Sequence, residues 1–355
     1  MERRLAMAVA QLSTTSSLEE VPCLICGESE ADELLLGQDE FYGIPGQFRV
    51  MCCPRCDLGY ISPRPHFEEI LQYYPSDYYS FAPSDGLPSV ASQANHWQKT
   101  YLAHRGYPTH IRLKAWTSVE LWMYRVFRGE KLGVAFRPIP RWQAGGRLLD
   151  VGCGAGFYLS ELKKLGWDVY GVEISPQACA AAESSYGVPT FCGSLETAPF
   201  PPASFDVITL WEALEHLPNP QETLERAYQL LRPNGYILGS VPNRHSVYTD
   251  LFGPAYYAWE LPRHLYHFSR KSFVLLAQKV GFRSVRIRTF TVGASILILS
   301  LGIRKNRRLG QRGLPTNFWD GKTLWLRLLS WMLKPGHALV DRMGLGIHIE
   351  FEAKK

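Results

Sequence analysis

A glycine-rich turn directly follows a short apolar segment in the middle of the chain. Residues 147–162 read RLLDVGCGAGFYLSEL, in which the apolar run ends at Asp150 and glycines occupy the alternate positions Gly152, Gly154 and Gly156. Glycines at this spacing let a ligand approach the backbone closely at the start of the helix that follows. Such a turn predicts a binding site for a nucleotide or a nucleoside.

The spacing of these glycines distinguishes between classes of ligand. A dinucleotide-binding turn has the pattern G-x-G-x-x-G, but Phe157 stands where the third glycine would be. The phosphate-binding pattern G-x-x-x-x-G-K, followed by serine or threonine, is absent from the sequence. Glu173 ends the next expected strand, where a carboxylate can accept hydrogen bonds from both ribose hydroxyls. The turn therefore favours a nucleoside without a pyrophosphate, and Asp150 can order the turn amides or meet a ligand ammonium.

Five of the eight cysteines lie close together near the N-terminus. Cys23 and Cys26 form one C-x-x-C pair, and Cys53 and Cys56 form a second. Four thiolates in two such pairs suit the tetrahedral coordination of zinc, in a site with a structural role. Cys52 is a rival ligand, and reduced cysteines in a small core are the alternative to a metal.

The pattern of apolar and polar residues changes along the remaining sequence. From about residue 141, apolar strands alternate with amphipathic helices, which predicts a doubly wound, mainly parallel α/β sheet. The expected division is a flexible tail at 1–20, a zinc-ribbon-like module at 21–62, a helical lid or linker at 63–140, a core at 141–293, a helical insert at 294–346 and a final core strand at 347–355.

The lid or linker segment has two interpretations. A packed helix is favoured by the spacing of its apolar residues Leu113, Trp116, Leu121 and Tyr124. The alternative is a lid over a pocket, with Tyr78 and Tyr79 reaching into it.

Composition limits the class of protein and its surroundings. The chain has 355 residues, 46% of them hydrophobic and 20% charged, and a net charge of +5, as in ordinary globular proteins. It lacks an apolar run long enough to span a bilayer, and AMAVA near the start is too short for a secretion signal. We therefore expect a cytoplasmic protein.

The insert has two interpretations. Its sequence ASILILSLGI, followed by RKNRR, predicts a helical cap or, alternatively, a surface that contacts lipid or a lipid-linked substrate.

Five motifs in the core now follow one another in a recognisable order: LLDVGCGAG, VYGVEIS, FDVITLWEALEHLPNP, LLRPNGYILGSVPN and HLYHFSRKSF. They resemble the motifs of class I S-adenosylmethionine-dependent methyltransferases, over about residues 145–290, and the resemblance extends to the final strand. The cysteine module followed by YYPSDYYSF also looks like a subgroup of bacterial methyltransferases that act on sugars and other natural products. Asp57 differs from this subgroup, which has a glycine after the second cysteine pair.

The resemblance implies a Rossmann-like fold and S-adenosylmethionine as the cofactor. Asp150 and the three glycines would surround its methionine part, and Glu173 would bind the ribose. Ser194 and Leu195 stand where the family has its adenine contacts. Trp211 either lines the pocket near the methyl group or is an ordinary core residue. The predicted cofactor-binding residues are therefore Asp150, Gly152, Gly154, Gly156, Glu173, Ser194, Leu195 and Trp211.

Methyl transfer needs positioning more than activation, because the methyl on a sulfonium is already reactive. The acceptor must lie in line with the C–S bond, and a hydroxyl acceptor must lose its proton. Histidine can take a proton near neutral pH, which makes His216, His264 and His267 the candidate catalytic residues. Each of them can instead be structural.

These observations predict methyl transfer, as O-methylation with histidine-assisted deprotonation, to a small-molecule, glycan-like or lipid-linked acceptor. The alternative is a zinc-containing regulatory module that binds nucleic acid, with a Rossmann-like core. It is disfavoured because RKNRR is the only dense basic cluster and lies far from the cysteines in sequence. A nicotinamide dehydrogenase is a third candidate, disfavoured by Phe157.

Overall fold

The computed structural model describes residues 18–75, 78, 89–121, 134, 137–291, 295–311 and 324–355. Within these residues, seven strands form one sheet in the order β12-β13-β10-β9-β6-β7-β8. The strands are β6 (Arg147–Val151), β7 (Asp168–Glu173), β8 (Thr190–Cys192), β9 (Phe205–Trp211), β10 (Leu231–Pro242), β12 (Ser284–Phe290) and β13 (His348–Lys354). Strands β6 to β10 are parallel, whereas β13 runs antiparallel to both β10 and β12. The predicted mainly parallel α/β sheet is confirmed, and residues 348–354 are its expected final strand.

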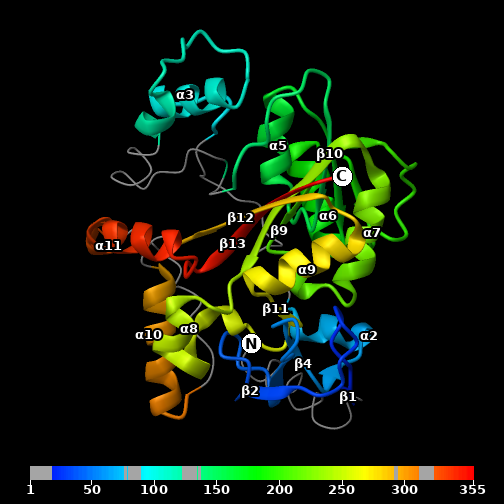
Figure 1. Ribbon diagram of the computed structural model, residues 1–355, viewed down its shortest axis with the longest axis vertical. Helices are drawn as coiled ribbons and strands as arrows, with labels where there is room; N and C mark the ends of the chain where they lie inside the picture. The colour runs from blue at the N-terminus through cyan, green and yellow to red at the C-terminus, as the bar shows by residue number, and fades with distance from the viewer. Residues whose placement is uncertain are drawn as a thin grey trace.

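Helices cover both faces of this sheet (Figure 1). On one face, α5 (Phe157–Lys164) and α6 (Pro176–Tyr186) pack on side chains such as Leu148 and Val207. On the other face, α7 (Pro220–Leu230) and α9 (Arg270–Val280) pack on side chains such as Leu149 and Ile208. Successive residues of a strand point to opposite faces, so buried strands with helices on both sides need continuous apolar runs.

The N-terminal module is a second, antiparallel sheet at one end of the molecule, and its strands from the N-terminal segment are blue in Figure 1. Its strands are β2 (Asp32–Gly37), β3 (Phe48–Cys52), β4 (Gly59–Ile61) and β11 (Tyr266–His267). Strand β11 comes from the segment expected to belong wholly to the core, so the boundary drawn at residue 62 is too simple. Strand β1 (Leu18–Glu19) pairs with β5 (Arg64–Pro65), so the expected tail ends before residue 18.

A buried ion-pair network joins the module to the core. The Arg263 guanidinium is fully buried, and it donates to Asp39 of the module at 2.8 and 3.1 Å and to Glu260 at 3.1 Å. It also donates to the Tyr73 carbonyl at 3.0 Å and lies over the Tyr42 ring. The single positive charge of the guanidinium is therefore compensated inside the protein by two carboxylates.

The lid or linker segment contains short helices, α2 (Phe67–Ile70), η1 (Leu71–Tyr73) and α3 (His96–His104). The packed helix predicted around residues 113–124 is wrong for its first part, because Leu113 and Trp116 are 48% and 58% exposed. Helical structure there starts only at residue 117, and among the described residues Leu113, Trp116 and Leu121 only Leu121 is buried. Tyr124 and Tyr79 lie outside the described residues.

The insert is helical, as expected. It contains α10 (Ser295–Arg308) and α11 (Leu324–Arg342). Helix α10 packs against α8 (Val247–Phe252) and the 3-10 turns η3 (Gly253–Ala255) and η4 (Tyr257–Trp259), and α11 packs against β12 (Figure 1). Within the described part of the chain, we find no helix long and apolar enough to cross a membrane. Peripheral membrane contact through the insert stays a prediction.

Replacing Asp39 by asparagine tests the junction between module and core. We expect Asp39→Asn to lower the free energy of unfolding by about 3 kcal/mol, because it removes one charge of a buried pair and leaves Arg263 less compensated. The matched control is Glu33→Gln, which removes one partner of the exposed Glu33–Arg49 pair and should cost less than about 1 kcal/mol. Urea unfolding measures both changes, and equal small effects would contradict this account.

Candidate active site

The backbone of the turn explains its glycines. The turn connects β6 to α5, and Gly152, Gly154 and Gly156 have φ of 71°, 54° and 85°, all in the left-handed region that favours glycine. A Cβ on Gly156 would also lie 2.9 Å from the Ala182 Cβ of α6. The alternating spacing therefore has a structural cause, and it leaves the turn backbone close to the carboxyl edge of the sheet.

Glu173 holds this turn. Its Oε2 accepts from the Gly154 amide at 2.9 Å, and its Oε1 accepts from the Ser175 amide at 3.0 Å. The side chain is nearly buried at the end of β7. A carboxylate has about four acceptor positions, so two remain for ligand hydroxyls.

Asp150 has a different role from the predicted ordering of the turn amides. It is fully buried, and its Oδ1 accepts from the Thr209 hydroxyl of β9 at 2.6 Å. Its Oδ2 has no hydrogen-bond partner among the described residues, and Arg137 Nη1 lies 3.9 Å away. Burial raises the pKa of Asp150 to about 7. The unpaired oxygen is thus an available acceptor beneath the turn.

The other predicted cofactor contacts lie along the same edge. Ser194 is partly exposed, and its hydroxyl lies 3.3 Å from the Thr197 hydroxyl. Leu195 is buried, so it can offer only a packing surface. Trp211, the last residue of β9, is also buried and meets the Tyr158 ring edge to face at 5.7 Å. The core interpretation of Trp211 is therefore consistent with its burial.

Two of the three candidate histidines lie together. His216 ends the turn η2 (Leu214–His216), and its ring centroid lies 4.6 Å from that of His264. His216 Nδ1 lies 3.0 Å from the Arg263 carbonyl, and His264 Nδ1 lies 2.9 Å from the Ala258 carbonyl. A carbonyl can only accept, so both Nδ1 atoms carry the proton and both Nε2 atoms keep a lone pair in the neutral ring.

The protonation states of His216, His264 and Glu215 follow from their burial. Burial lowers the pKa of His216 to about 3, and it also lowers the pKa of His264. Both rings are therefore neutral at physiological pH. Burial, together with the negative charge of Glu212, raises the pKa of Glu215 well above its usual range. Glu215 is fully buried, and neither of its oxygens has a hydrogen-bond partner among the described residues.

His267 does not join this contact group. Its ring centroid is 6.4 Å from that of His264 and 4.8 Å from the Trp259 ring. Its backbone belongs to β11 and pairs with Gly59 of β4. The structure thus places His267 at the seam between the two sheets.

One residue of this site, Tyr74, was missed by sequence reasoning. Tyr74 Oη lies 2.9 Å from His216 Nδ1, and Tyr78 Oη donates to Glu260 Oε1 at 3.0 Å. Tyr78 therefore contacts the segment that carries His264, whereas the lid interpretation stays a prediction. The spacing of Glu260 and His264, four residues apart, is a sequence signal for their proximity, but no local signal marks Tyr74.

The four paired cysteines converge in the N-terminal module. Cys23 Sγ lies 3.3 Å from Cys56 Sγ, Cys26 Sγ lies 3.4 Å from Cys53 Sγ, and all four sulfurs lie within 4.8 Å of one another. Zinc–sulfur bonds of about 2.3 Å in a tetrahedron give sulfur–sulfur distances of about 3.8 Å, which is comparable. Cys52 is not in this group; its Sγ accepts from Arg244.

The residues after each cysteine pair share a left-handed conformation. Gly27 has φ of 69° and Asp57 has φ of 66°, and each amide donates to the carbonyl of the first cysteine of its pair. Asp57 therefore adopts the backbone conformation that a glycine would provide. Its carboxylate binds Arg244 and lies 2.8 Å from His245 Nε2, which ties this turn to the segment after β10.

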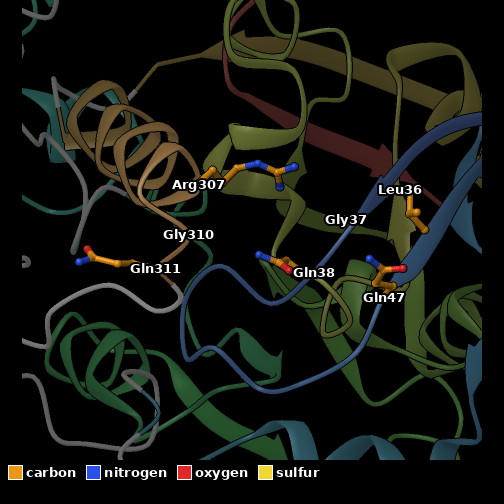
Figure 2. Close-up of a pocket in the computed structure, with 7 residues that line it drawn as sticks. All are labelled: Leu36, Gly37, Gln38, Gln47, Arg307, Gly310 and Gln311. Atoms are coloured by element: carbon orange, nitrogen blue, oxygen red, sulfur yellow. The ribbon is translucent and has the colours of Figure 1, made fainter.

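A pocket of about 410 Å³ lies elsewhere, between the module and the end of α10 (Figure 2). Leu36, Gln38 and Gln47 line it on one side, and Arg307 and Gln311 on the other. None of its lining residues is a predicted cofactor or catalytic residue. The sheet edge therefore remains the candidate site.

Comparison with known proteins shows which proteins the core is similar to. Residues 127–287 match the family model described as a methyltransferase domain. A ubiquinone biosynthesis O-methyltransferase of Paraburkholderia phymatum is 36% identical over 146 residues, which cover 39% of this chain and 62% of that protein. The corresponding protein of Xanthomonas oryzae is 35% identical over 143 residues, covering 38% and 59%. The chain thus spans about six tenths of the length of these relatives.

Solved structures give more distant similarities. An S-adenosylmethionine-dependent methyltransferase of Archaeoglobus fulgidus has a TM-score of 0.43 and 21% identity, covering 66% of this chain and 99% of that one. A phosphoethanolamine N-methyltransferase of Haemonchus contortus has a TM-score of 0.44 and 19% identity, covering 83% and 62%. Residues 127–287 thus match a methyltransferase domain, and the strand order of the sheet, with its antiparallel β13, is that of a Rossmann-like α/β fold.

Proposed function

We propose that the chain transfers a methyl group from S-adenosylmethionine to an oxygen atom of a small-molecule, glycan-like or lipid-linked acceptor. The observation that carries the proposal is the glycine turn held by Glu173 inside a matched methyltransferase domain. The relatives named ubiquinone biosynthesis O-methyltransferase support oxygen as the acceptor atom.

The cofactor would lie along the carboxyl edge of β6, β7 and β9. Glu173 would bind the ribose hydroxyls through its remaining acceptor positions. The unpaired Oδ2 of Asp150 offers an acceptor to the ammonium group of the methionine part. Ser194 and Leu195 would contact the adenine, and Trp211 would lie near the methyl group.

The reaction transfers one methyl group to the acceptor and removes one proton from it. The C–S bond of the sulfonium breaks with its electron pair on sulfur, and the acceptor oxygen forms the new C–O bond. His216 and His264 would assist the loss of the acceptor proton. The low pKa of His216 makes it a weak base, so the assistance is effective only towards a hydroxyl that is already acidified.

The two rival functions gain no support from the described contacts. Arg307 of the RKNRR cluster pairs with Glu40 of the N-terminal module, so part of this basic charge has an internal partner. Phe157 is the first residue of α5 and stands where a dinucleotide-binding helix has its third glycine.

Glu173→Ala tests the cofactor site. We expect the affinity for S-adenosylmethionine to fall at least tenfold, because each hydrogen bond to the carboxylate is worth about 1.5–3 kcal/mol and about 1.4 kcal/mol is a factor of ten. The control is Glu183→Ala, on the exposed face of α6, which should bind like the wild type. Calorimetry measures both, with thermal unfolding as a check on the fold. Unchanged affinity in Glu173→Ala would exclude the proposed ribose contact.

We also propose that Cys23, Cys26, Cys53 and Cys56 bind one structural zinc ion. The convergence of four sulfurs supports this proposal. Four thiolates complete the tetrahedral coordination of a zinc ion and leave no open position for water. The role of the zinc would therefore be to stabilise the module.

Metal analysis of the pure protein tests the zinc proposal. We expect about one zinc per chain, and loss of that zinc in the double variant Cys53→Ser/Cys56→Ser. Cys192→Ser, which changes an exposed cysteine outside the cluster, should keep the metal. A wild-type protein without zinc, or a double variant that retains it, would refute the proposal.

A further inference from the structure

Glu215 is a buried carboxylate without a compensating partner among the described residues. A buried polar group that lacks a partner costs free energy, and the cost is larger when the group is charged. Glu215 lies in η2, directly after β9, at the sheet edge where ligands bind in folds of this kind. Its charge therefore needs a proton or a cation.

Two imidazoles beside Glu215 have the arrangement of metal ligands. One nitrogen of His216, one of His264 and a carboxylate oxygen of Glu215 lie within 4.8 Å of one another. Both rings donate through Nδ1 to backbone carbonyls, at Arg263 and Ala258. Metal-binding histidines usually donate their other ring nitrogen in this way, which fixes the tautomer and the ring orientation. The Nε2 lone pairs are then available to a cation.

The surrounding charges favour a positive ion. The carboxylate of Glu260 lies 3.6 Å from His264 Nε2. Glu212, three residues before Glu215, pairs with His348 at 3.1 Å. The nearby Arg263 pairs with both Asp39 and Glu260, so its single positive charge is outweighed by two carboxylates.

We propose that Glu215, His216 and His264 bind a divalent transition-metal cation. Two imidazole nitrogens and one carboxylate suit the divalent ions of the first transition row, from Mn²⁺ to Zn²⁺. Three protein ligands leave coordination positions open, as catalytic metal sites require. A single proton on Glu215 would also neutralise the carboxylate, and metal titration distinguishes the two cases.

The role of this cation rests on the methyl transfer proposed above. A hydroxyl of the acceptor that coordinates the cation loses its proton to water more readily, because the positive charge stabilises the resulting oxyanion. That oxyanion then attacks the methyl carbon, and the electron pair of the broken C–S bond remains on sulfur. The histidines assist deprotonation by holding the cation, so their weak basicity is no obstacle.

Titration of the full chain with Mn²⁺ tests this site. Mn²⁺ is a suitable probe because it prefers carboxylate over the thiolates of the cysteine cluster. After a chelator removes loosely bound metal, we expect electron paramagnetic resonance to show about one bound Mn²⁺ per chain, and thermal unfolding to shift upward with Mn²⁺. Glu215→Gln and His264→Asn should each weaken binding about tenfold or more and abolish that upward shift.

Two comparisons separate a metal ligand from a merely structural residue. Without metal, Glu215→Gln should be about as stable as the wild type, because it replaces a buried carboxyl that has no hydrogen-bond partner among the described residues by an amide of similar size. Glu222→Gln, an exposed residue in the first turn of α7, should bind Mn²⁺ like the wild type. A wild type that binds no Mn²⁺, or a Glu215→Gln variant that binds it equally well, would overturn the proposal. S-adenosylmethionine binding, measured on the same proteins without Mn²⁺, tests the proposed function separately.

Discussion

The arrangement of the site depends on the ion pairs that the buried guanidinium of Arg263 forms. Its side chain pairs with Asp39 of the N-terminal module and with Glu260 of its own segment. Its backbone carbonyl accepts from His216, which belongs to the core. One residue therefore connects the module, the histidine group and the sheet edge. The module thus supplies a carboxylate that compensates the buried charge of Arg263 beside the histidine group.

The same edge contains buried carboxylates whose hydrogen bonding is incomplete. Asp150 has one oxygen without a partner among the described residues, and Glu215 has two. Native proteins satisfy most buried polar groups, and exceptions concentrate where a ligand completes the set. Asp150 lies under the glycine turn, whereas Glu215 lies beside His216 and His264. The cofactor and the acceptor are thus expected at neighbouring but separate places along one edge.

The parts of the fold that depend on local patterns were predictable. Strand and helix periodicity predicted the sheet, and the short spacing within each C-x-x-C pair predicted the cysteine cluster. Local spacing also predicted the turn at Gly152, Gly154 and Gly156, because left-handed backbone at alternate positions requires glycine.

Long-range pairing was not predictable from such patterns. Strand β11 completes the sheet of the N-terminal module from about two hundred residues away in sequence, through Tyr266 and His267. The partner of Asp150 is Thr209 because the register of β6 on β9 places them side by side, and register is not visible in either segment alone. The helix predicted around Trp116 failed because apolar spacing alone does not show what the segment packs against.

The central claim, that the glycine turn and Glu173 bind a sulfur nucleoside, is tested most directly by calorimetry on the wild-type protein. The ligands are S-adenosylmethionine, its demethylated product S-adenosylhomocysteine, and NAD. The account predicts that both sulfur nucleosides bind in a ratio of about one per chain and that NAD does not bind. Binding of NAD, with no binding of either sulfur nucleoside, would contradict it.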